Sequence, residues 1–165
     1  MNIIAIDQII NVFTGEVFVT TQPCQLVSRG IGSCVVVAAF CRDACIGGLA
    51  HIMLPGRSPK GSQEPLRYAH DGISRLFSLL EKQGAHGQSC VLCLAGGGNV
   101  LRRDDDTICM NNITSIFDFL EEKKLAVAAL SLGGYERRSV RLDVAGGCVY
   151  CTGGEEKECR LFPRN

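Results

Sequence analysis

Apolar residues along the chain form short continuous runs and two stretches with helical spacing. Runs rich in β-branched residues, such as V-V-V-A-A-F at 35–40, are typical of strands buried on both faces. Apolar positions three and four residues apart predict a helix over 66–83, ended by Gly84, and a second helix over 111–123, capped by Asn111 or Asn112. The runs predict strands over 3–6, 17–20, 24–27, 35–40, 46–54, 89–95, 125–132, 139–144 and 148–152.

Strands outnumber helices in this pattern, and tight glycine turns join several of them. Such turns connect antiparallel neighbours, whereas parallel strands need long crossovers. We therefore expect an α+β fold, a layered sandwich of mostly antiparallel β-sheets with helices packed on the outside. One domain is expected over residues 1–165, with 1–20 and 153–165 at its periphery and a polar tail that frays from Gly153 onward.

Charge and hydropathy narrow the range of partners. Seventeen basic side chains balance seventeen acidic ones, which argues against nucleic acid or an anionic membrane surface. The apolar runs are shorter than the ~20 residues that span a bilayer. The first residues, M-N-I-I-A-I-D-Q, lack the basic region of a signal peptide. We expect a cytoplasmic protein without membrane insertion.

Ten cysteines require an explanation in a chain of this size. A reducing compartment argues against a disulfide scaffold, and thiols also serve as small buried hydrophobes. Two Cys-x-x-Cys pairs, Cys90/Cys93 and Cys148/Cys151, are compatible with structural zinc. Both pairs lie in predicted strands, where residues i and i+3 point to opposite faces. We predict core thiols without a metal; a zinc-stapled interaction domain is the alternative, which stoichiometric zinc would reveal.

Cys34 and His51 are the candidate catalytic pair. They lie on consecutive predicted strands, so a hairpin brings thiol and imidazole together. A nucleophilic cysteine needs a base or a field that lowers its pKa. The preceding G-I-G-S provides backbone N–H groups, at Gly32 and Ser33, for oxyanion and substrate binding. The pattern alone leaves open that Cys34 is a buried thiol and His51 a hydrogen-bonded core histidine.

Two further motifs do not predict a binding site. The glycine loop at 96–99 is not followed by Lys-Ser/Thr, so it does not predict a phosphate site. Three consecutive carboxylates at 104–106 are typical of a solvated charged patch rather than a divalent-metal site.

The segments G-I-G-S-C-V-V-V and G-G-L-A-H-I-M-L-P resemble the CheD family, the chemoreceptor glutamine deamidases of bacterial and archaeal chemotaxis. Further landmarks follow in the family's order over about residues 20–155. They are Tyr68-Ala69, Gly84-Ala85, the A-G-G-G of 95–98, I-C-M-N-N-I, Gly133-Gly134 and Arg138-Ser139-Val140.

The resemblance implies a layered α/β fold and conversion of receptor glutamine to glutamate through a thioester. It assigns Cys34 as nucleophile and His51 as general base, and it requires no cofactor. Ser28 stands at the position of the family's threonine and is retained as the orienting residue. Hydrolysis of receptor methyl esters and docking of a CheC-type phosphatase are also implied.

The chain departs from the family pattern on its receptor-facing surface. Asn111 stands where the family tends to have arginine, and Tyr135-Glu136 replace an asparagine–arginine pair. The Tyr135-Glu136 pair, together with Ser28 in place of the family's threonine, supports an alternative of another class, a non-catalytic adaptor that binds CheC or receptors.

Overall fold

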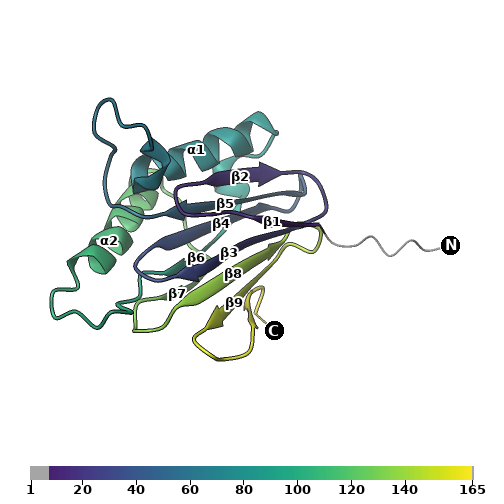
Figure 1. Ribbon diagram of the computed structural model, residues 1–165. Coiled ribbons are helices and arrows are strands. Elements are labelled where there is room, and N and C mark those ends of the chain that lie inside the picture. The colour runs from purple at the N-terminus through teal and green to yellow at the C-terminus, as the bar shows by residue number, and fades with distance from the viewer. Residues whose placement is uncertain (1–7, 165) are drawn as a thin grey trace.

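Two five-stranded sheets pack face to face, and two helices cover the outer face of one sheet (Figure 1). The computed structural model describes residues 8–164. In chain order the elements are β1 Ile9–Asn11, β2 Val17–Thr20, β3 Gln25–Ile31, β4 Val35–Cys41, β5 Ile46–Ile52, the 3-10 turn η1 Pro65–Arg67, α1 Ala69–Lys82, η2 Gly87–Ser89, β6 Val91–Gly96, α2 Thr107–Glu122, β7 Ala129–Leu132, β8 Arg138–Asp143, β9 Cys148–Gly153 and β10 Cys159–Phe162.

The strand order is β1-β3-β8-β9-β10 in the first sheet and β2-β5-β4-β6-β7 in the second. Every neighbouring pair is antiparallel except β1–β3 and β6–β7. The predicted α+β sandwich with mostly antiparallel sheets and outer helices is confirmed.

The second sheet is buried on both faces, which explains the continuous apolar run of β4. Alternate residues of this strand enter different cores: Val35 and Val37 face the helices, whereas Val36 and Ala38 face the first sheet. The helices contribute one apolar face each to the former core, with Leu76 of α1 fully buried there. Neither helix is long and apolar enough to cross a membrane, a finding that applies to the described residues.

Helix α2 begins at Thr107, so the prediction that it starts near 111 is wrong. The buried face of its first turns carries Cys109 and Asn112. Because Asn112 is polar, these turns lack the regular apolar spacing from which a helix is predicted. The predicted strand over 125–132 begins only at Ala129. Leu125, at the start of the predicted strand, belongs instead to the turn that follows the C-terminal end of α2, where its N–H donates to Leu120 O at 2.8 Å.

The N-terminal segment contributes to the body of the fold. Strand β2 pairs with β5 as predicted from its apolar run, and β1 adds an unpredicted edge to the first sheet. Residues that were expected at the periphery therefore form sheet edges. The predicted strand over 3–6 lies outside the described residues.

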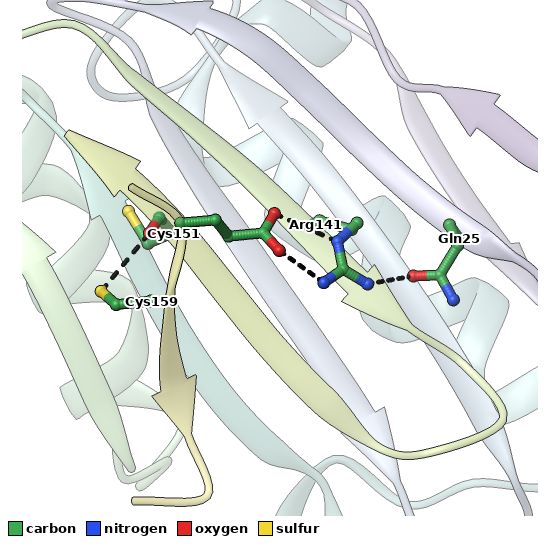
Figure 2. Close-up of polar contacts among 5 residues, drawn as sticks. Gln25, Arg141, Cys151 and Cys159 are labelled. Carbon is green, nitrogen blue, oxygen red and sulfur yellow. Dashed lines mark hydrogen bonds and ion pairs between the residues drawn. The ribbon is translucent and has the colours of Figure 1, made fainter. Parts of the chain in front are cut away.

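Polar contacts fix the C-terminal strand to the first sheet (Figure 2). Strand β10 pairs with β9, and Arg141 of β8 reaches across the sheet surface. Its guanidinium forms an ion pair with Glu158 at 2.6 Å and donates to Gln25 Oε1 at 2.7 Å. The prediction that the tail frays is wrong for residues 159–162, because their backbone completes the sheet.

Candidate active site

The β4–β5 hairpin places Cys34 and His51 on the same face of the second sheet. His51 lies opposite Val36, and Cys34 precedes Val36 by two residues. Cys34 and His51 are therefore diagonal neighbours, whose Cα atoms in regular sheets lie about 7–8 Å apart. In this structure the His51 ring contacts Val12 O through Nδ1, and no hydrogen bond joins its Nε2 to the Cys34 sulfur. The hairpin predicted from the two apolar runs is confirmed.

Cys34 lines a cleft of about 390 Å³. The cleft is lined by Gly30, Gly32, Ser33, Cys34, Gly98, Asn99, Val100, Leu101, Arg103, Asp105, Asp106, Thr107, Ile108, Cys109 and Arg137. His51 is 3% exposed. Cys34 therefore lines the cleft, whereas the buried His51 is not among the residues that line it.

Residues 12–16, which we call the strap, enclose His51. The Gly15 N–H donates to His51 O at 2.9 Å, and the His51 N–H donates to Glu16 O at 3.0 Å. The ring atom Nδ1 lies 3.4 Å from Val12 O. The strap thus contacts both the backbone and the ring of the candidate base.

The Val12 carbonyl also selects the tautomer of His51. A carbonyl oxygen can only accept, so this contact requires the proton on Nδ1 and leaves a lone pair on Nε2. Nε2 is buried and has no hydrogen-bond partner within the described part of the chain. His51 is therefore arranged to accept a proton at Nε2.

Ser28 contacts the same carbonyl rather than the imidazole. Its hydroxyl, buried in the structure, donates to Val12 O at 2.7 Å. The residue lies on β3, which continues past the predicted turn to Ile31 with a register shift. Any orienting effect of Ser28 on His51 would pass through the Val12 carbonyl oxygen. Because this acceptor belongs to the backbone, the identity of residue 12 does not reveal it in the sequence.

Burial keeps both members of the pair uncharged. It raises the pKa of the Cys34 thiol above the ordinary 9.0, and hydrogen bonds from the Thr14 hydroxyl and the Cys34 N–H limit this rise. Burial lowers the pKa of His51 below 6.5, an effect opposed by the Val12 carbonyl and the Glu16 carboxylate. Both shifts favour thiol and neutral imidazole near pH 7 over a thiolate–imidazolium pair.

Alkylation of Cys34 is expected to depend on pH in a direction set by its raised pKa. Because only the thiolate reacts, iodoacetamide should label native Cys34 slowly at pH 7, and the rate should still climb as pH rises above 9.0. The measurement is mass spectrometry of the labelled peptide at several pH values, with urea-denatured protein as reference. A plateau for native Cys34 at lower pH than in the denatured chain would contradict the prediction.

Three hydrogen bonds fix the loop before the thiol. The carbonyls of Gly32 and Cys34 accept from Gly98 N–H at 2.9 Å and Gly97 N–H at 2.7 Å. The carbonyl of Ser33 accepts from Asn112 Nδ2 at 2.9 Å. The glycine loop at 96–99 thus uses two of its N–H groups to hold this segment.

The same contacts orient the candidate oxyanion donors. In a planar trans peptide the N–H points opposite to the preceding carbonyl. The N–H groups of Ser33 and Cys34 therefore point away from Gly98 and Asn112. Both residues line the cleft, and the Cys34 N–H lies on the side of its own sulfur.

The Cys-x-x-Cys pairs do not converge. Cys93 lies in the core between the sheets, whereas Cys90 packs against the core under the helices, so their predicted opposite orientation is confirmed. All ten thiols are free. Among the described residues, no group of three or more His, Cys, Asp or Glu side chains is arranged to hold a metal ion.

Comparison with known proteins identifies the family. Residues 53–153 match the family described as CheD chemotactic sensory transduction. The chain belongs to the CheD family. It is 36% identical over 151 residues to the probable chemoreceptor glutamine deamidase CheD of Chlorobium luteolum, covering 91% of this chain and 75% of that protein.

Archaeal CheD proteins are similar as well. The probable chemoreceptor glutamine deamidase CheD of Methanococcus maripaludis is 29% identical over 150 residues, covering 90% of this chain and 97% of that protein. The protein of the same name from Haloarcula marismortui is 30% identical over 140 residues, covering 84% and 81%. An aligned span of 91% of the chain includes Cys34 and His51, both of which precede the residues 53–153 that match the family model.

Proposed function

We propose that this protein is a cytoplasmic chemoreceptor glutamine deamidase that uses Cys34 as nucleophile and His51 as general base. The observation that carries the proposal is a cysteine that lines a cleft, with a buried histidine on the neighbouring strand whose Nε2 has no hydrogen-bond partner among the described residues. The names of the CheD relatives supply the substrate class.

In the first half-reaction, His51 Nε2 takes the thiol proton as the Cys34 sulfur attacks the carboxamide carbon of a receptor glutamine. The N–H groups of Ser33 and Cys34 stabilise the oxyanion, each contributing about 3 kcal/mol in comparable sites. Gly32 lies beside them, its carbonyl held by Gly98, and shapes the substrate side of the loop. Protonated His51 then gives its proton to the departing ammonia, and a thioester remains.

In the second half-reaction, water attacks the thioester with His51 again accepting a proton. Collapse of the intermediate releases glutamate, and the sulfur regains its proton from His51. Ser28 assists by holding the Val12 carbonyl that fixes Nδ1. The sequence of steps needs neither a metal nor an organic cofactor.

The rim of the cleft supports a macromolecular substrate. Leu101 is 70% exposed and Ile108 is 52% exposed, and both line the cleft. Exposed apolar side chains beside a reactive group suit the surface of a receptor helix. The same acyl-transfer chemistry would release methanol from a receptor glutamyl methyl ester, and a CheC-type phosphatase would be a second partner.

A non-catalytic adaptor is the alternative. Tyr135, one of the residues that depart from the family pattern, is 56% exposed, and the Arg102 guanidinium lies 4.7 Å from its ring centre. An exposed aromatic and cation pair of this kind suits binding. An adaptor, however, gives no reason for the arrangement of the Cys34 loop and His51.

A deamidation assay separates the two. Purified protein is incubated with a chemoreceptor cytoplasmic fragment, and receptor peptides are examined by mass spectrometry for the mass change from amide to acid. We expect conversion at specific glutamines. Binding of the fragment without conversion would reject the enzyme and favour the adaptor.

A further inference from the structure

Asn112 lies at the junction of the two segments that carry the candidate catalytic pair. Its side chain belongs to α2 and is completely buried. Nδ2 donates to Ser33 O at 2.9 Å and to Met53 O at 3.0 Å, so both amide hydrogens are used. Ser33 directly precedes Cys34, and Met53 follows His51 by two residues. One nitrogen thus joins the nucleophile loop to the end of the strand that carries the base.

Apolar packing alone does not explain an amide at this position. The side-chain oxygen of Asn112 is buried and has no hydrogen-bond partner among the described residues. An unpartnered buried acceptor is unfavourable, and a leucine of similar size would avoid it, but leucine would also remove the donor from the Ser33 and Met53 carbonyls. Neighbouring inner positions of the helix, such as Ile116 and Leu120, are apolar. The amide is therefore explained by its two donors, which an apolar residue cannot supply.

The hydrogen bond to Ser33 O has a directional consequence. The peptide between Ser33 and Cys34 is planar, so fixing its carbonyl also fixes the direction of the Cys34 N–H. That N–H lies on the side of the sulfur and faces away from α2. A loss of this contact would let the loop rotate, which would move the thiol and the oxyanion donor together.

We propose that Asn112 is a positioning residue for the Cys34–His51 pair, holding the nucleophile loop and the end of the base strand at a fixed separation. The inference rests on the proposed deamidase function for its catalytic consequence. Its structural consequence, the placement of the thiol, stands independently and is measured without a receptor.

The test compares Asn112→Leu with Ile116→Ala. The leucine variant removes both donors at similar volume, whereas Ile116→Ala destabilises the same helix one turn later and leaves both hydrogen bonds intact. For each folded protein, the rate of Cys34 alkylation is measured against pH, together with kcat and KM for deamidation. Thermal unfolding is recorded for each variant as a measure of stability.

We expect opposite changes in the two readouts for Asn112→Leu. A released loop exposes the thiol, so the alkylation profile should move to lower pH, while kcat falls roughly 10–100-fold through misplacement with KM little changed. Ile116→Ala should lower the unfolding temperature without moving either readout. If wild type shows no deamidation, the shift in the alkylation profile still tests the positioning role.

A second variant tests the proposal even if Asn112→Leu does not fold. Asn112→Ser retains one hydroxyl donor in a small side chain, so it can hold at most one of the two carbonyls, and we expect a partial shift in the same direction. An unchanged alkylation profile in folded Asn112→Leu or Asn112→Ser would overturn the proposal and make Asn112 a structural residue only.

Discussion

Cys34→Ala and His51→Ala are each expected to remove receptor deamidation. The first variant lacks the nucleophile, so activity should fall to the uncatalysed background. The second retains the thiol but lacks the proton acceptor, and general-base catalysis typically contributes about 10²–10⁴-fold. Because burial raises the pKa of Cys34 and keeps it protonated near neutrality, the loss in His51→Ala should be greatest at neutral pH and smaller at alkaline pH. Glutamine-to-glutamate conversion measured by mass spectrometry at several pH values gives both results.

Matched controls come from residues of the same type that lie away from the cleft. Cys45 and His86 are exposed, so Cys45→Ala and His86→Ala should retain wild-type conversion. In the wild type, the lowered pKa of His51 should keep the base neutral, so activity should persist as pH falls to 6.5 and decline only at lower pH. Undiminished conversion by folded Cys34→Ala would reject the mechanism.

Gly96→Ala is expected to cause the largest loss of stability of any single methyl addition at the site. Gly96 has φ of 127°, which side chains rarely adopt, and an added Cβ would lie 2.2 Å from Cys34 O. Backbone strain and the collision together should lower the free energy of unfolding by roughly 2–6 kcal/mol. Relief of the collision requires the Cys34 carbonyl to move away from the Gly97 N–H. Urea unfolding measures the stability, and Cys34 alkylation measures the displacement of the thiol in the folded fraction.

The control for this prediction is Gly84→Ala. Gly84 also has a positive φ, 96°, but no atom lies within 4 Å of the added Cβ. Gly84→Ala should therefore lose only the conformational contribution of a side chain at positive φ, about 1–3 kcal/mol. Equal losses in the two variants would show that the close approach of Gly96 to the nucleophile loop is not the cause.

The sequence predicted the parts of the site that depend on local patterns. The two apolar runs around Val36 and His51 are consecutive and joined by a short turn, so their antiparallel pairing followed from the chain itself. The alternation of β4 between two cores likewise followed from its unbroken apolar character. These features determine which face the candidate pair shares.

The remaining parts depend on contacts that a sequence does not encode in a recognisable pattern. The acceptor shared by Ser28 and His51 is the backbone carbonyl of Val12, whose side chain has no bearing on the contact. Asn112 resembled a helix cap because asparagine favours that position. Its actual role depends on where α2 begins and on the packing of α2 against two distant loop carbonyls.

The hydrogen bonds that fix the Cys34 loop also determine at which stage of folding the Cys34 thiol acquires its native reaction rate. Asn112 reaches its two acceptors across 79 and 59 residues of chain. Contacts of such high sequence separation form late, because closing long loops has an entropic cost that only the assembled structure offsets. A partly folded chain, even one with the β4–β5 hairpin in place, would therefore hold an unconstrained thiol. The native reaction rate of Cys34 should thus report completion of the whole fold.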